Sequence, residues 1–274
     1  MSSAENEEDL TRKQRREQAR ADRKAIEEAS AADAARRKRL TRLGIVVAVV
    51  VAAVVVILIA TSGGGSTPPK KGSTGAKHVE KEVTTLLAGI PQSGASLGSS
   101  KAPVTLQYYG DLECPICKKF TLGALAPLIQ HWVREGKLRI EYRNLETATR
   151  EPETFKSQQA AALAAGTQAK LWNYIETFYH EQGTEDSGYV TEQYLRGIAE
   201  QVPGLNLAKW TSERTKPEYA SQIESDAQAA NAAGFNGTPS FLIGHTGGAT
   251  KTLEYSSLED PSSFNNAIEQ QLKA

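Results

Sequence analysis

Residues 104–120 read VTLQYYGDLECPICKKF, and this stretch decides the fold class. Its first part, Val104–Tyr109, is rich in β-branched and aromatic residues and ends at a glycine, which is typical of a strand. The apolar residues that follow recur at helical spacing and predict a helix over 114–135. Cys114 and Cys117 fall in its first turn. The sequence therefore predicts a cysteine pair at a strand-to-helix junction.

A Cys-x-x-Cys pair at the start of a helix suits thiol–disulfide chemistry. The first cysteine, Cys114, faces unpaired backbone N–H groups and the positive end of the helix dipole, which favour the thiolate, the attacking species. Cys117, one turn later, can resolve a mixed disulfide. Pro115 and Ile116 form the dipeptide between the cysteines, and a proline is well tolerated there because no N–H bond is lost in the first turn.

Three other interpretations of the pair remain open. A structural disulfide that closes a loop of about four residues would add only about 2 kcal/mol in the chain-entropy model, so it would stabilise the fold weakly. Two ordinary buried cysteines are a second possibility. Half of a zinc site is the third, and its other ligands would come from histidines that are not paired at ligand spacing, namely His78, His131, His180 and His245.

The rest of the C-terminal part alternates between strand and helix patterns. Further strands are expected at 138–142, 240–243 and 252–255, and a closing amphipathic helix at the C-terminus. A long Ala-, Gln- and Glu-rich segment at about 151–235 predicts a helical insertion. The order strand, helix, strand, helical block, strand, strand, helix predicts an α/β fold.

A second motif, Gly237-Thr238-Pro239-Ser240, directly precedes the expected strand at 240–243. A proline at the first position of a strand is compatible with the ladder of hydrogen bonds. Together with the sequence from Gly110 to Phe120, this motif resembles the DsbA-like branch of the thioredoxin superfamily, and in particular its membrane-anchored bacterial forms. The resemblance covers roughly residues 85–272.

The resemblance implies a thioredoxin-like fold with thiol–disulfide oxidoreductase activity and with neither cofactor nor metal. Cys114 would be the nucleophile and Cys117 the resolving residue, joined in a redox-active Cys114–Cys117 disulfide. Pro239 would be a cis-proline opposite this disulfide, and the Thr238 backbone would pair with an extended substrate segment. The substrates would be unfolded or reduced exported polypeptides. A quinone-linked membrane reoxidase, DsbB-like or VKOR-like, would take up the electrons.

The sequence departs from this family at Tyr108. Many thioredoxin-like domains carry a buried acid at this position, where it can shuttle a proton. Asp111 and Glu113 lie nearer to the cysteines, and their positions at a strand end or in a loop predict exposed side chains. Trp172 and Phe120 are expected to pack in the core.

The N-terminal quarter of the chain has a different composition. Residues 1–42 are expected to form a charged tail, 43–61 a transmembrane helix and 62–78 a flexible linker rich in Gly, Ser, Thr, Pro and Lys. The segment Leu43–Ala60 has no charged or polar side chain and would span about 27 Å as a helix, close to a hydrocarbon core of about 30 Å. Residues 79–274 would then form the catalytic domain.

The orientation of the expected transmembrane helix follows from the flanking charges. Basic residues are concentrated before it, and only Lys70 and Lys71 follow closely after it. This asymmetry predicts a single-pass protein of the cell membrane with a cytoplasmic N-terminus and an extracytoplasmic catalytic domain. A cleaved signal peptide is the alternative, although the charged leader is longer than usual.

The overall composition narrows the range of functions. Lys and Arg total 32, as do Asp and Glu, so the balanced charge argues against a dedicated nucleic-acid binder. Only two cysteines are present, which excludes a disulfide-dense scaffold. The sequence therefore predicts an enzyme that introduces or exchanges disulfides in exported proteins. The alternatives are a reductase or isomerase of the same fold, or a redox-inactive, membrane-tethered peptide-binding or chaperone module.

Overall fold

The computed structural model describes residue 68 and residues 70–274. The expected charged tail (1–42) and transmembrane helix (43–61), with residues 62–67 and 69 of the expected linker, lie outside the described residues. Within the described ranges, no helix is both long enough and apolar enough to cross a membrane. Helix α2 (Thr74–Leu87), which was not predicted from the sequence, begins within the expected linker, where the Ser73 side chain caps it by accepting a hydrogen bond from the Ala76 N–H. Residues 74–78 are therefore helical rather than part of a linker.

The described residues form a six-stranded sheet in the order β1-β2-β4-β3-β5-β6. Strands β3 and β4 are parallel, and β5 is antiparallel to β3. Every residue of β3 except Gln107 is buried, as its apolar sequence predicts for a central strand. The strands are β1 (Gln92–Ser93), β2 (Ser96–Leu97), β3 (Val104–Gly110), β4 (Leu138–Asn144), β5 (Ser240–His245) and β6 (Thr250–Thr252).

Three of the four expected strands are confirmed as β3, β4 and β5. The fourth was placed too late in the sequence. β6 ends at Thr252, whereas the prediction ran to Tyr255. The Tyr255 ring does not extend the ladder but packs edge-on against Phe241, which explains why an aromatic residue lies just beyond the strand.

The helix that follows β3 is confirmed, with an irregularity in its middle. Pro127 lies in its interior, has no N–H to donate and crowds the preceding turn, which favours the wider π-helical turns on either side of it. The successive segments are α3 (Pro115–Phe120), a π-helical turn (Thr121–Leu125), α4 (Ala126–Leu128) and a second π-helical turn (Ile129–Val133).

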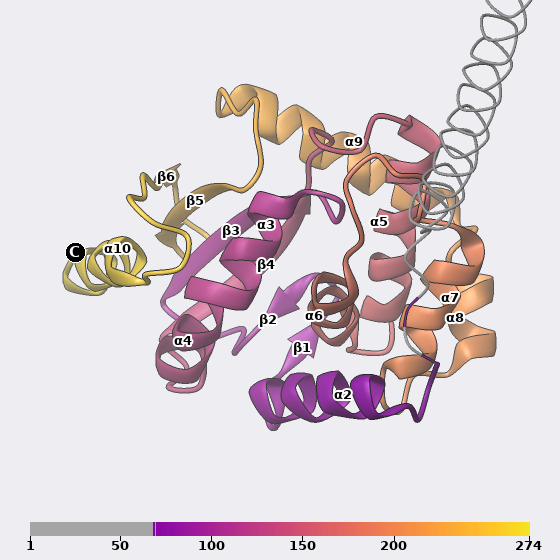
Figure 1. Ribbon diagram of the computed structural model, residues 1–274. Helices are drawn as coiled ribbons and strands as arrows, with labels where there is room; N and C mark the ends of the chain where they lie inside the picture. The colour runs from indigo at the N-terminus through magenta and orange to yellow at the C-terminus, as the bar shows by residue number, and fades with distance from the viewer. Residues whose placement is uncertain (1–67, 69) are drawn as a thin grey trace, which may run out of the picture. The chain divides into compact units, whose positions relative to one another are not determined.

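The expected helical insertion is also confirmed. Figure 1 shows α5, α7 and α8 grouped to one side of the sheet, whereas α10 lies beside β5. The helices are α5 (Pro152–Gly166), α6 (Leu171–Glu181), α7 (Glu192–Gln201), α8 (Leu207–Glu213), α9 (Pro217–Ala232) and α10 (Ser262–Lys273). Trp172 of α6 and Phe120 of α3 are fully buried, as the sequence predicts.

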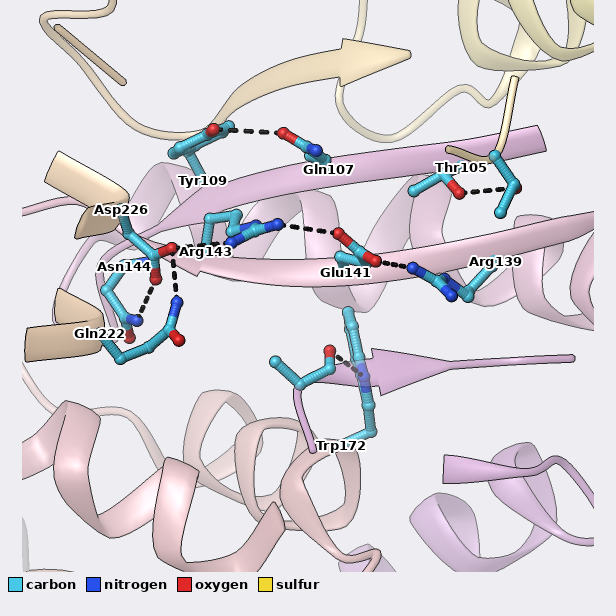
Figure 2. Close-up of polar contacts among 12 residues, drawn as sticks. Thr105, Gln107, Tyr109, Arg139, Glu141, Arg143, Asn144, Trp172, Gln222 and Asp226 are labelled. Atoms are coloured by element: carbon cyan, nitrogen blue, oxygen red, sulfur yellow. Dashed lines mark hydrogen bonds and ion pairs between the residues drawn. The ribbon is translucent and has the colours of Figure 1, made fainter. Parts of the chain in front are cut away.

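A row of charged side chains ties α9 to β4 (Figure 2). Arg139, Glu141 and Arg143 alternate with buried residues along β4 and therefore share one face of the sheet. Glu141 pairs with both arginines, and Arg143 Nη1 lies 3.0 Å from Asp226 Oδ1 on α9. Asp226 is itself buried and accepts a hydrogen bond from the Asn144 N–H at 3.1 Å. These contacts thus hold α9, the helix that precedes β5, at the end of β4.

Candidate active site

The two cysteines lie where the sequence predicts, at the end of β3 and the start of α3. Cys114 caps α3 with an extended backbone (φ −68°, ψ 117°), and its Sγ accepts a hydrogen bond from the Cys117 N–H at 3.3 Å. Cys114 is 5% exposed, whereas Cys117 is completely buried. Both are free thiols, so the Cys114–Cys117 disulfide remains a prediction. The helix start brings one sulfur close to the surface and covers the other.

The environment of Cys114 favours its thiolate. The hydrogen bond from the Cys117 side chain is the largest influence that lowers the pKa of Cys114, to about 6 from an ordinary value of 9.0. The Thr238 side chain and the N–H groups of Cys117 and Ile116 act in the same direction and together outweigh the effect of burial. Burial raises the pKa of Cys117 well above its ordinary value. At neutral pH the Cys114 sulfur, rather than the Cys117 sulfur, is therefore the one that ionises, and its role as the nucleophile remains a prediction.

The second motif lies against this nucleophile. The Thr238–Pro239 peptide bond is cis, which confirms the expected geometry. The Cys114 Sγ donates to the Thr238 carbonyl oxygen at 3.4 Å, although the two residues are far apart in the sequence. The Tyr255 hydroxyl donates to the Pro239 carbonyl oxygen at 3.3 Å and holds the other side of the loop. The role of Thr238 and Pro239 in substrate binding remains a prediction.

The surface around Cys114 is apolar. Pro115 and Ile116 are exposed, and the Ile116 side chain is 40% exposed. Tyr255 is 37% exposed, and its hydroxyl contacts the carbonyl oxygen of Pro239 beside Thr238, which faces Cys114. An apolar side chain of a bound polypeptide could therefore bury surface on either side of the sulfur.

Tyr108 lies at the position, six residues before Cys114, at which the family resemblance leads to the expectation of an acid. It is fully buried, and its hydroxyl lies 3.3 Å from Thr121 Oγ1 and 3.2 Å from the Tyr179 hydroxyl. Burial raises the pKa of Tyr108, and the nearby Cys117 raises it further. Tyr179 donates to the Asp111 carbonyl oxygen at 3.1 Å. The tyrosine thus replaces a carboxylate with a neutral hydrogen-bonded group.

The expectation that Asp111 is exposed was wrong. Its side chain is completely buried, and Oδ2 accepts hydrogen bonds from the N–H groups of Thr147, Ala148 and Thr149 at 2.9–3.1 Å. Oδ1 accepts from the Glu113 N–H at 3.1 Å and from the Thr149 hydroxyl at 2.7 Å. A loop that turns its N–H groups inward makes a site for an anion. Because the donors are mostly backbone groups, no pattern of side chains in the sequence predicts that Asp111 is buried.

The expectation for Glu113 was also wrong. This residue directly precedes Cys114 and is only 3% exposed. Burial raises the pKa of Glu113 from 4.5 to about 7, a hydrogen bond with the Thr149 side chain opposes this change, and the carboxylates of Asp111, Asp186 and Glu185 add to it. A titratable carboxyl therefore lies beneath the cysteine turn.

Gln182 is a further site residue that the sequence does not single out. Its side-chain amide donates to the carbonyl oxygens of Leu112 at 2.7 Å and Cys114 at 3.1 Å. It lies at the C-terminal end of α6, so the insertion fixes the turn that carries the nucleophile. A glutamine in a Gln-rich helical segment gives no sequence signal for this role.

Histidines that a zinc site would need are paired with glutamates instead. His131 pairs with Glu135 at 3.2 Å, and His78 pairs with Glu82 at 3.3 Å. In the part of the chain that the structure describes, no group of three or more His, Cys, Asp or Glu side chains could hold a metal ion. The half-zinc interpretation of the cysteine pair has no partner residues there.

Comparison with known proteins agrees with this arrangement. BdbD from Bacillus subtilis, in its oxidised form, superposes with a TM-score of 0.56 at 20% identity, covering 69% of this chain and 98% of that one. The alpha-DsbA1 of Wolbachia pipientis superposes with a TM-score of 0.54 at 16% identity, covering 68% of this chain and 92% of that one. These two likenesses establish the thioredoxin-like fold with its helical insertion.

Sequence comparison points in the same direction. A probable disulfide bond formation protein D of Bacillus anthracis is 22% identical over 149 residues, which cover 54% of this chain and 68% of that protein. This relative supports the expected enzyme class, a DsbA-like thiol–disulfide oxidoreductase. A family model described as thioredoxin matches residues 92–264, more than half of the chain, and spans both the cysteine turn and the cis-proline loop. The chain belongs to the thioredoxin family.

Proposed function

We propose that this protein is a DsbA-like oxidoreductase that introduces or exchanges disulfides in exported polypeptides through Cys114 and Cys117. The observation that carries the proposal is the position of Cys114. Its sulfur has a lowered pKa of about 6, lies 3.4 Å from the carbonyl oxygen of the residue before cis-Pro239, and covers a buried second thiol. A structural cysteine pair would need none of these features.

The proposed reaction proceeds in two exchanges. A substrate thiolate attacks Cys114 Sγ of the oxidised pair, the Cys114–Cys117 bond breaks, and Cys117 leaves as a thiolate that takes up a proton. A second substrate thiolate then attacks the substrate sulfur of the mixed disulfide, and Cys114 leaves. The substrate loses two electrons and gains a disulfide, and the enzyme gains two thiols. Because the pKa of Cys114 is about 6, it leaves as a stable thiolate at neutral pH.

The low pKa also favours one direction of electron flow. Stabilising the Cys114 thiolate stabilises the reduced enzyme relative to the disulfide, and a couple with a stabilised reduced form is an oxidant. We therefore favour oxidation of substrates over their reduction. The reduced pair then needs an electron acceptor, and we propose a quinone-linked membrane reoxidase of the DsbB-like or VKOR-like kind.

The proposed location depends on the charges that flank residues 43–61. Basic residues cluster before this segment, so the catalytic domain would lie outside the cytoplasm, where disulfides persist. Protease added to spheroplasts should then remove the domain and leave a membrane-held fragment that contains residues 1–42. Complete protection of the domain would place it on the other side and rule out exported substrates.

The activity itself is tested with a reduced peptide that contains two cysteines. The oxidised protein should convert this peptide to its disulfide form with stoichiometric loss of its own disulfide, measured by mass spectrometry. Cys114→Ser should abolish the reaction. Cys117→Ala, incubated with the disulfide form of the peptide, should accumulate a mixed disulfide between Cys114 and the peptide, because Cys114 can attack the peptide disulfide but the resolving sulfur is missing. A protein that binds the peptide but exchanges no disulfide would instead be a redox-inactive binding module.

A further inference from the structure

Hydrogen bonds join the two sides of the active site in a closed ring. On the cysteine side, the Cys114 N–H donates to the Asp111 carbonyl oxygen at 3.0 Å. On the other side, the Thr147 N–H donates to the Asp111 carboxylate at 3.1 Å, and Thr147 Oγ1 lies 2.5 Å from Thr238 Oγ1. In its thiol form, the Cys114 Sγ closes the ring by donating to the Thr238 carbonyl oxygen. Asp111 is the residue at which the two sides meet.

The partners of the Asp111 carboxylate are all uncharged. Three successive backbone N–H groups, from residues 147–149, converge on Oδ2 within 3.1 Å. Gln158 of α5 donates to Oδ1 at 3.2 Å, so the insertion contributes as well. Hydrogen bonds to an ionised acceptor are roughly twice as strong as neutral ones. The conformation of the loop at 147–149 therefore depends on this one carboxylate.

We propose that Asp111 is a positioning residue for polypeptide substrates: it fixes the loop at 147–149 and, through Thr147, the Thr238 edge that faces Cys114. The proposal rests on the proposed exchange function. It adds how the spacing between Cys114 and the Thr238 backbone is maintained. The Asp111 carboxylate forms its hydrogen bonds with residues 113, 147–149 and 158, and only the Asp111 backbone contacts a sulfur, that of Cys117. A small thiol needs only Cys114, whereas an extended peptide needs Cys114 and the Thr238 backbone at a fixed spacing.

The first variant is Asp111→Asn, which keeps the side-chain size but replaces one acceptor oxygen with an NH2 group that cannot accept from a backbone N–H. For a reduced peptide, KM should rise and kcat/KM should fall by about 10- to 100-fold, the range expected from a misplacement of about 1 Å. Exchange with dithiothreitol, a small dithiol, should stay close to that of the unmodified protein. The measurement is the ratio of the two rates.

A second variant decides the matter even if Asp111→Asn does not fold. Thr147 is exposed, so Thr147→Val keeps the shape of the side chain and removes only the hydroxyl that contacts Thr238. This variant should lower peptide exchange selectively and in the same direction as Asp111→Asn. Thr147→Ser, which restores the hydroxyl, should recover the peptide rate.

The matched control is Asp226→Asn. Asp226 is also a buried aspartate that accepts several hydrogen bonds, but it anchors α9 to β4 through Arg143 and Asn144 (Figure 2). It should lower stability and leave the ratio of peptide to dithiothreitol rates unchanged. Equal losses toward both thiols in Asp111→Asn, an unaffected Thr147→Val, or the same selective loss in Asp226→Asn would overturn the proposal. Failure of the unmodified protein toward both thiols would instead refute the proposed function.

Discussion

At the scale of single residues, the active site gives two neighbouring sulfurs opposite properties. Cys114 lies near the surface and receives the Cys117 N–H at 3.3 Å, whereas Cys117 is shut off from solvent. Hydrogen bonding lowers the pKa of Cys114 to about 6, and burial raises the pKa of Cys117. Only the sulfur that a substrate can reach is therefore a thiolate at neutral pH, which suits an exchange that must begin and end at Cys114.

This difference predicts distinct rates of alkylation. In the reduced protein, the reaction of Cys114 with iodoacetamide should rise with pH to a midpoint near the pKa of about 6, because only the thiolate reacts. Cys117 should stay unmodified until the protein unfolds. Mass spectrometry of peptides from samples quenched at a series of pH values measures both rates. Equal and slow modification of the two cysteines at neutral pH would contradict the assigned roles.

The sequence predicts the cysteines better than it predicts their surroundings. The Cys-x-x-Cys spacing, the strand before it and the Thr238–Pro239 motif place the main groups correctly, and the cis bond is confirmed. Asp111 and Glu113 were expected to be exposed, because an acid at a strand end is usually solvated. Asp111 is buried because backbone N–H groups and a threonine from a distant loop donate hydrogen bonds to it, whereas Glu113 is buried beside it with the Thr149 side chain as its hydrogen-bond partner. Backbone donors leave no trace in a sequence.

At the scale of elements, the long helix after β3 carries the nucleophile and is held by the chain before α10. The Leu258 carbonyl oxygen accepts from the Ala124 N–H at 3.0 Å, which is possible because the π-helical turn does not use that donor in the regular way. This close approach requires a glycine. A Cβ at Gly123 would lie 2.9 Å from both Leu258 O and Glu259 Cα.

Gly123→Ala should therefore destabilise the fold, although alanine is the better helix former. The atoms that the new Cβ would meet belong to the backbone of Leu258 and Glu259, so this loop would have to move. The expected cost is about 1–3 kcal/mol in the free energy of unfolding. Urea titration of the described domain measures the change. Gly197→Ala in α7 is the control. Its Cβ would contact only the Pro68 ring, at 3.2 Å, and Pro68 lies near the start of the described residues. A stabilised Gly123→Ala variant would contradict the described packing.

Elements with a long periodic pattern are predicted well from this sequence. β3, β4 and β5 and the inserted helices carry enough apolar residues to reveal their period. The β1–β2 hairpin was missed because its strands, Gln92–Ser93 and Ser96–Leu97, are too short and too polar to show alternation. The hairpin exists because β2 pairs with the edge of β4, and this long-range contact becomes visible only in the structure.

At the scale of the whole domain, the insertion does more than cover the sheet. Gln182, directly after α6, donates to the cysteine turn, and Tyr179 of α6 donates to the Asp111 carbonyl oxygen. The same helix also carries a buried acid. Glu176 is 1% exposed, and within the described residues its Oε1 has no hydrogen-bond partner. Burial raises its pKa from 4.5 to about 8.

This acid predicts how stability depends on pH. Between about 4.5 and about 8, Glu176 is ionised in the unfolded chain and protonated in the folded one, so the folded state binds more protons. The contribution of Glu176 to the free energy of unfolding should therefore fall as pH rises through this range, by up to about 1.4 kcal/mol per pH unit. Above pH 8 it should level off.

Glu176→Gln removes this titration. The free energy of unfolding of this variant should fall less steeply than that of the unmodified protein as the pH rises from 5 to 8, the pKa of Glu176 being about 8. Urea unfolding at several pH values in this range measures the slope. The exposed Glu254→Gln variant changes the same net charge and should keep the original slope. Parallel curves for all three proteins would show that Glu176 titrates normally.

The reduction potential of the Cys114–Cys117 couple shows whether the two cysteines can oxidise a substrate. Equilibration with glutathione redox buffers, followed by trapping and mass analysis, gives this value. Because the Cys114 thiolate is stabilised in the reduced protein, we predict a couple that is more oxidising than that of thioredoxin, with a value between about −270 mV and the value of about −120 mV found for DsbA. A value near −270 mV, as in thioredoxin, or the absence of a reversible disulfide between the two cysteines, would contradict the account.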